Sequence, residues 1–189
     1  MRLKRPLILL LLLPAMLGAT VFLDNRLADD DAARIFGNMT YHIDDAPDQK
    51  DITLLNGAYA GWELSVRYGE RYVYGDFNHD ELQDAAVMII ENTGGNQDWY
   101  TLVFLMNNGE RLIHHATIYL DDRAVINSLR EKNGRVFIDM YVHQPGDCNG
   151  GPSKRLREWY EYPGRDVFAS RIGTYIFGEI TDGVKGEPG

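Results

Sequence analysis

A short acidic segment is the part of this sequence with the clearest capacity for chemistry. Asp76, Asn78, Asp80 and Asp84 stand at positions 1, 3, 5 and 9 of one stretch. A hard cation such as Ca²⁺ takes about six to eight oxygen ligands. Alternate side chains of a tightly curled loop can point inward together, and the backbone carbonyl of Leu82 would add a further oxygen. The spacing therefore predicts a Ca²⁺ site formed by these five residues.

The segment differs from an EF-hand at two positions. Position 6 is Glu81 instead of Gly, and position 12 is Val87 instead of a bidentate Glu. Glu81 would adopt a strained backbone conformation in the turn. The remaining pattern, which runs into the apolar residues 85–90, resembles the calcium loops of FG-GAP-type β repeats. Coordination by protein on all sides would leave no position for a substrate, so the predicted ion is structural. The alternative is an acidic turn whose Asp and Asn side chains bond their own backbone.

The N-terminal residues are predicted to direct export. Arg2, Lys4 and Arg5 precede an uncharged, Leu-rich stretch over residues 6–23. This stretch is near the lower limit of the roughly 17–25 residues that span a bilayer. Two interpretations stay open: a signal peptide cleaved after Ala19, and a retained N-terminal membrane anchor. Both predict an exported domain that is periplasmic or tethered to the inner membrane.

The charge balance restricts the partners. Removal of residues 1–19 takes away three of the 19 basic residues and none of the 28 acidic ones, which leaves 16 against 28 and a net charge of −12. Such a chain repels phosphate backbones, so nucleic acid is not an expected partner. The expected partner is an unknown envelope protein or glycan, and membrane contact is expected only through an uncleaved N-terminal segment. Cys148 is the only cysteine, so no internal disulfide can form.

The sequence divides into four parts. Residues 1–23 are the signal peptide or anchor, 24–37 a linker or short helix, 38–180 a single β-rich domain, and 181–189 a flexible tail. Acidic residues 29–31 favour the start of a helix, and Gly37 favours its end.

Nearly every segment of the β-rich domain is typical of a strand followed by a tight turn. Trp62, Leu64, Val66 and Tyr68 alternate with polar residues, which predicts a half-buried strand. Residues 85–90 are apolar on both faces, which predicts a central position in a sheet. Four hairpins are predicted, with turns at 56–57, 107–109, 132–134 and 163–164. The predicted fold class is mainly β: an antiparallel meander, as a sandwich or a strongly curved sheet, with a short N-terminal helix.

Three further groups of residues bear on chemistry. Period two places His114 with Ala116, Ile118 and Leu120, as a core or interface histidine, and His115 on the other face with Thr117 and Tyr119. Cys148 lies near His143, but a thiol nucleophile also needs an orienting group for its base. An aromatic set is interpreted as core, with a sugar- or peptide-binding platform as the alternative; it comprises Tyr72, Tyr74, Trp99, Tyr100, Trp159, Tyr160 and Tyr162.

Six motifs follow one another along the chain: N-M-T-Y at 38–41, L-N-G-A-Y at 55–59, the acidic segment at 75–87, residues 100–109, L-D-D-R at 120–123 and residues 136–147. Their order is similar to that in a family of uncharacterised bacterial periplasmic proteins and lipoproteins. The resemblance spans residues 38–162 and implies an envelope location without an established activity. Members often carry a Cys pair after the last motif, where this chain has only Cys148. They also usually have Gly in place of Glu81.

Three functions follow as hypotheses. The first is an exported domain with a structural Ca²⁺ loop and a non-catalytic binding or structural role. The second is a metal-dependent hydrolase that uses the Asp76–Asp84 cluster with His79, and the third is an inhibitor of a secreted enzyme that presents residues 144–153. The first is preferred, because the sequence holds no phosphate-binding Gly loop, no G-x-S-x-G and no H-E-x-x-H.

Overall fold

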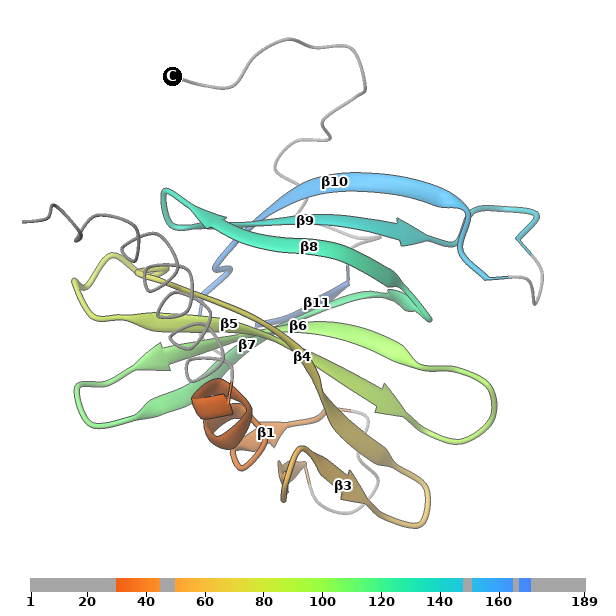
Figure 1. Ribbon diagram of the computed structural model, residues 1–189. Coiled ribbons are helices and arrows are strands. Elements are labelled where there is room, and N and C mark those ends of the chain that lie inside the picture. The colour runs from red at the N-terminus through yellow and green to blue at the C-terminus, as the bar shows by residue number, and fades with distance from the viewer. Residues whose placement is uncertain (1–29, 45–49, 148–150, 165–166, 171–189) are drawn as a thin grey trace, which may run out of the picture.

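A computed structural model describes residues 30–44, 50–147, 151–164 and 167–170. The predicted export segment, the tail and Cys148 lie outside these residues. Within them, the chain forms strands β1 to β11, arranged in three sheets, and one short helix (Figure 1). The predicted fold class, mainly β with a short helix, is confirmed. No helix among these residues is long and apolar enough to cross a membrane.

The largest sheet has six strands in the order β11-β7-β6-β5-β4-β3. Its strands are β3 (Ala58–Ala60), β4 (Ser65–Gly75), β5 (Asp84–Asn92), β6 (Trp99–Asn107), β7 (Leu112–Asp122) and β11 (Val167–Ser170). Every residue of β5 except Asn92 is buried. The predicted central position of residues 85–90 is therefore confirmed, because a strand covered on both faces must be apolar on both.

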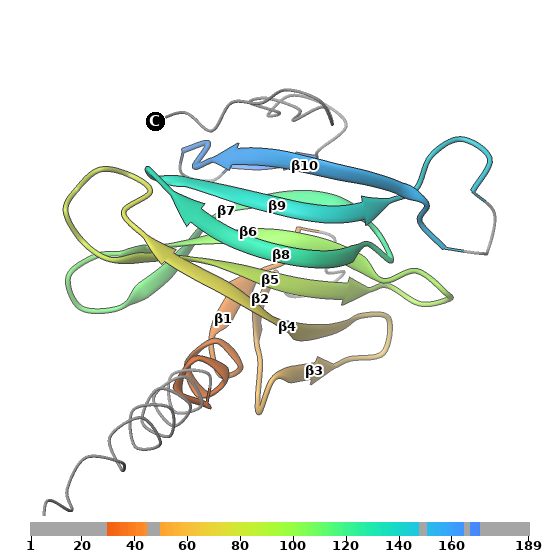
Figure 2. The ribbon, with the colours of Figure 1, turned by 45° about the horizontal axis from the view of Figure 1, so that its top comes forward.

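A three-stranded sheet covers one face of the six-stranded sheet (Figure 2). It consists of β8 (Val125–Lys132), β9 (Arg135–Val142) and β10 (Lys154–Glu161). Val136, Ile138, Met140 and Val142 alternate along β9 and are all fully buried. They pack against the even-numbered residues of β5 and β6 in one hydrophobic cluster. The two sheets thus form the predicted sandwich.

The helix and a small hairpin cover the other face. The helix spans residues 30–36, and the hairpin pairs β1 (Thr40–His42) with β2 (Asp51–Thr53). Phe36, Tyr41 and Leu54 bury their side chains against odd-numbered residues of β5 and β6. The amide of Gly37 donates to the carbonyl of Ala33 at 2.9 Å, so the helix ends at the predicted glycine.

The hairpin pairing predicted around the turn at 56–57 is wrong, and so is the strand position predicted for Trp62. Asn56 and Gly57 have φ of 53° and 88°, as a primed turn requires, but only the bridge between Leu55 and Ala58 joins the segments on either side. β2 pairs instead with β1, and β3 pairs with β4. Trp62 is 98% exposed, because it lies in the turn closed by the Gly61–Leu64 hydrogen bond, before β4 begins.

The hairpin predicted around residues 163–164 is also wrong in its pairing. β10 pairs with β9, whereas β11 runs parallel to β7 in the other sheet. A Pro-Gly turn specifies that the chain changes direction, but the partner of the next strand is set by the nearest free sheet edge. The hairpins at 107–109 and 132–134 are confirmed, by β6 with β7 and by β8 with β9.

Because β5 is buried on both faces, its side chains should contribute most to stability. We expect Ile89→Ala to lower the free energy of unfolding by about 2–5 kcal/mol. Val125→Ala, at a half-exposed position of β8, should change it by less than about 0.5 kcal/mol. Urea denaturation followed by circular dichroism measures both values. Equal losses in the two variants would contradict the central role of β5.

Candidate functional site

The predicted cation loop connects β4 to β5, and its acidic side chains accept hydrogen bonds from the loop's own backbone. The Asp76 carboxylate accepts from the amides of Asp80 and Glu81, each at 3.1 Å. The amide oxygen of Asn78 also accepts from the Asp80 amide at 3.1 Å. Oxygens from Asp76 and Asn78 therefore converge on a single N–H group.

Asp80 continues this network. Its Oδ1 accepts from the amide of Leu82 at 2.9 Å, and its Oδ2 accepts from the side-chain amide of Asn78 at 2.8 Å. Two residues have left-handed backbone conformations: His79 with φ of 63° and Glu81 with φ of 69°. The strain predicted for Glu81 in place of glycine is confirmed, and it costs roughly 1–2 kcal/mol per residue. The side-chain caps of Asp76, Asn78 and Asp80 offset it.

Asp84 occupies a different environment from the other three. Its side chain is fully buried at the start of β5. Oδ2 accepts from the amide of Phe77 at 3.0 Å, and Oδ1 accepts from the amide of Asn107 at 2.8 Å. One carboxylate thus joins the beginning of the loop to the end of β6. The bonds help to compensate the large cost of burying a charge.

The structure therefore brings Asp76, Asn78 and Asp80 into one network and places Asp84 in a separate clamp. The backbone hydrogen bonds of the acidic-turn interpretation are present. Carboxylate oxygens have further lone pairs, so these bonds leave capacity for a cation. No group of three His, Cys, Asp or Glu side chains in the described part of the chain is arranged as a metal site. Ca²⁺ binding, including the role of the Leu82 carbonyl, stays a prediction.

His79, named in the hydrolase hypothesis, faces the neighbouring hairpin turn. Its imidazole packs against Gly134, where an added Cβ would come within 2.8 Å of the ring. Gly134 lies in the β8–β9 turn with φ of 73°. This contact connects the acidic loop to the three-stranded sheet. His79 acts here as a packing group between two turns.

A β-bulge changes the predicted faces of β7. The register with β6 shifts between Phe104 and Leu105, so Ala116 faces Phe104 in the sandwich core, while His114 faces Leu105 toward the helix. The prediction that His114 shares a face with Ala116, Ile118 and Leu120 is wrong. An inserted residue reverses the alternation of a strand, and nothing in the apolar pattern marked the insertion.

His114 links the β1–β2 hairpin to the central sheet through a hydrogen bond. Its Nδ1 accepts from the backbone amide of His42 at 2.9 Å, and its Nε2 lies 2.8 Å from the hydroxyl of Thr117. Thr117 thus shares a face with His114, contrary to the prediction. Burial, followed by the nearby His42, lowers the pKa of His114 to about 4. His115 contacts Tyr162 instead, so the two histidines serve different layers, as predicted.

An Asp–His pair that the sequence reading missed lies at the base of the 144–153 loop. Asp121 accepts from the backbone amide of His143 at 2.5 Å and from its Nδ1 at 3.3 Å. Nε2 of His143 is buried without a hydrogen-bond partner. Asp147 closes the loop by accepting from the amides of Gln144 and Ser153, each at 3.0 Å. The ends of the segment named in the inhibitor hypothesis are therefore fixed.

The aromatic set does not form one platform. Tyr72 and Tyr74 contact Phe36 on the helix side, whereas Tyr160 is in the sandwich core. Trp159 lies on the outer side of the three-stranded sheet. The core interpretation therefore holds for part of the set. The other residues lie on different sides of the sheets and do not share one surface.

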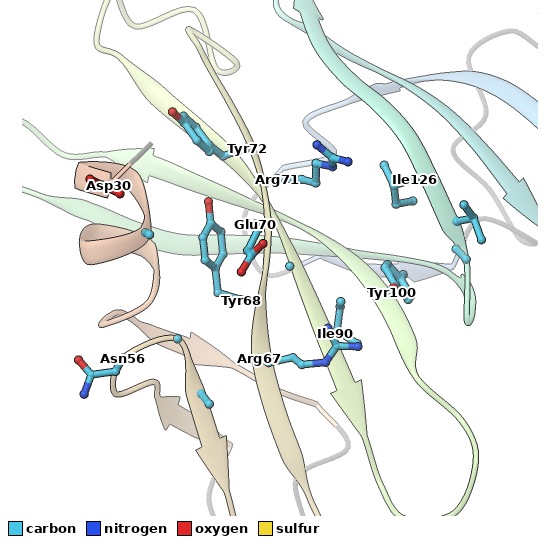
Figure 3. A pocket seen from close by; sticks show the side chains of 16 residues that line it. Asp30, Asn56, Arg67, Tyr68, Glu70, Arg71, Tyr72, Ile90, Tyr100 and Ile126 are labelled. Atoms are coloured by element: carbon cyan, nitrogen blue, oxygen red, sulfur yellow. The ribbon is translucent and has the colours of Figure 1, made fainter. Parts of the chain in front are cut away.

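A groove of about 1010 Å³ flanks β4 at its bulge (Figure 3). Tyr68 and Tyr72 point to the helix side, and Arg71 points toward Ile126 of β8. Glu70 lies at the bulge with φ of 54°. The lining mixes charges of both signs with apolar groups and holds no cluster of His, Cys, Asp or Glu suited to a metal.

Comparison with known proteins gave no match, whether with protein-family models, curated proteins or solved structures. The resemblance to bacterial periplasmic proteins stays a prediction based on the sequence motifs.

The Asp84 clamp predicts a specific sensitivity. In Asp84→Asn, one backbone N–H would face a side-chain NH₂ group, so we expect a loss of about 2–3 kcal/mol in the free energy of unfolding. Asp80→Asn is the matched control, because an exposed Asn still caps the turn, and its loss should be below about 0.5 kcal/mol. Urea denaturation in EGTA measures both. Similar values for the two variants would contradict the clamp.

His114 predicts a pH dependence of stability. Its pKa is about 4 in the folded state and about 6.5 when unfolded, so between these values the unfolded chain binds more protons. Stability should fall as pH drops from about 6.5 to about 4, by up to roughly 3 kcal/mol from this residue.

His114→Asn should remove that part of the decline, because Asn retains an acceptor without titrating. His42→Gln is the control: it keeps the backbone amide that His114 accepts from, and most of the decline should remain. Denaturation curves at pH 7.0, 5.5 and 4.5 test this. The same decline in His114→Asn as in the parent chain would refute the assignment.

Proposed function

We propose that this chain is an exported envelope domain with a non-catalytic binding or structural role. The observation that supports this role best is the use of the acidic loop's oxygens. Asp76, Asn78, Asp80 and Asp84 all accept hydrogen bonds from backbone amides. A carboxylate in such a role fixes a loop, whereas a catalytic group needs access to a substrate.

The loop connects three strands, β4, β5 and β6, with the β8–β9 turn. Asp84 connects the loop to β6, and His79 rests against the β8–β9 turn. β4 and β5 enter and leave the loop, so its conformation sets their register. The polar contacts of this loop therefore stabilise the sandwich.

We propose further that Ca²⁺ binds to this loop and strengthens these connections. Asp76, Asn78, Asp80 and the Leu82 carbonyl would hold the ion. Asp84, the fifth residue of the predicted set, would support the loop from its clamp on the amides of Phe77 and Asn107. The ion would neutralise carboxylates that otherwise repel one another across a short loop. Support comes from the convergence of the Asp76 and Asn78 oxygens and from the left-handed turn at Glu81.

Export is proposed from the N-terminal sequence and the acidic composition. Arg2, Lys4 and Arg5 before the Leu-rich stretch are typical of export signals. The domain would then lie in the periplasm, free or tethered to the inner membrane. The hydrolase hypothesis gains no supporting contact, since His79 packs against a turn.

Calcium should raise the melting temperature. With Ca²⁺ at about 100 times its dissociation constant, the stabilisation is about 2.7 kcal/mol, or roughly 5 °C or more for a domain of this size. Differential scanning calorimetry in Ca²⁺ and in EGTA measures the shift. Asp80→Asn should reduce it to less than half, and Glu63→Gln, which removes an exposed carboxylate elsewhere, should leave it unchanged. Identical melting of the parent chain in both buffers would refute the calcium proposal.

A further inference from the structure

The outward side of the three-stranded sheet is unusually basic for this protein. Because β9 directs Val136, Ile138, Met140 and Val142 inward, the alternate residues and their cross-strand partners face away from the sandwich. This basic face comprises Arg130, Lys132, Arg135, Arg155 and Arg157, the aromatic residues Phe137, Tyr141 and Trp159, and the carboxylates Asp139 and Glu161. Figure 1 shows β8, β9 and β10 as one layer over the six-stranded sheet.

The charge of this face opposes that of the whole chain. The chain has a net charge of −9, yet the basic face carries five cations and two carboxylates. Both carboxylates are in ion pairs: Asp139 accepts from Arg155 at 2.9 and 2.7 Å, and Glu161 accepts from Arg135 at 2.5 Å. The hydrogen bond from Arg155 is the main cause that lowers the pKa of Asp139 to about 2, so the pair stays ionised.

The centre of the face is aromatic. The rings of Phe137 and Trp159 are 4.9 Å apart, and the Arg130 guanidinium lies 5.2 Å from the Phe137 ring. Arg and aromatic residues are enriched at the energetic centres of protein interfaces, where they combine apolar area with directed hydrogen bonds. Arg130 and Lys132 are exposed at the edge of this centre, on β8.

We propose that the basic face docks an extended, acidic polypeptide segment with carboxylates at every second residue. Arg130 and Lys132 are two residues apart on one face of β8, and this spacing is about 6.6 Å. Alternate side chains of an extended peptide repeat at the same distance, so two of its carboxylates can meet both cations. This inference deepens the proposed binding role and rests on it.

The experiment uses the full chain, with synthetic peptides as probes. A fluorescent 12-residue peptide of alternating Glu and Thr is titrated with protein by anisotropy, beside a peptide of the same composition with its Glu residues in one block. We expect the alternating peptide to bind at least five-fold more tightly. We also expect its affinity to fall with added salt, because ion pairs at an exposed face are screened.

A matched pair of variants locates the site. Arg130→Ser with Lys132→Ser should weaken binding of the alternating peptide at least ten-fold. Lys50→Ser with Arg111→Ser removes the same charges on the hairpin side of the molecule and should change the affinity less than two-fold. Circular dichroism melts establish that both double variants are folded. Unchanged affinity in the first double variant, or equal losses in both, would overturn the proposal.

A competition experiment with a carbohydrate distinguishes an acidic peptide from an anionic glycan as the ligand. Polygalacturonate is titrated as a competitor at equal carboxylate concentration, and it should displace the alternating peptide poorly. Stronger binding of polygalacturonate than of the peptide would overturn the peptide proposal in favour of an anionic glycan. Melting in Ca²⁺ and EGTA is a separate readout on the same sample. The two proposals can therefore fail independently. A lack of peptide binding would not affect the calcium proposal, and an unchanged melting temperature in Ca²⁺ would not affect the docking result.

Discussion

The buried carboxylate of Asp84 is the interaction on which the arrangement of strands depends. A charge removed from water is tolerated only when hydrogen bonds replace its hydration. Asp84 meets this requirement with the amides of Phe77 and Asn107, which lie before β5 and at the end of β6. Satisfying one side chain therefore fixes the positions of two chain segments that are far apart in sequence. The register of the central strands follows from that fixed point.

The central strands then impose the layers around them. β5 and β6 are apolar on both faces, so both faces must be covered. The three-stranded sheet covers one, and the helix with the β1–β2 hairpin covers the other. His114 adds a directed contact to the second layer by accepting from the amide of His42. The outer surface of the three-stranded sheet carries five cations, and ion pairs such as Arg155–Asp139 and Arg135–Glu161 link β9 to β10 there.

Local sequence patterns predict the structure correctly where a feature depends on only a few neighbouring residues. The turn at 132–134 requires positive φ at Asn133 and Gly134, which have φ of 55° and 73°. The end of the helix at Gly37 and the strain at Glu81 follow from single-residue preferences in the same way. The pairing of β2 and of β11 was predicted wrongly, because strand partners are chosen among distant segments by burial and free edges. The bulge that turns His114 away from Ala116 left no trace in the apolar pattern.

The sequence by itself determined the fold class, the central position of residues 85–90, three of the turns and the grouping of Asp76, Asn78 and Asp80, because each depends on residue preference or on short-range spacing. Only the tertiary structure decided which layer each strand joins, that Asp121 meets His143, and that Asp84 clamps β6. It also decided that cations from β8, β9 and β10 share one face. These features depend on contacts between residues far apart in the chain, and such contacts are selected by the packing of the whole domain.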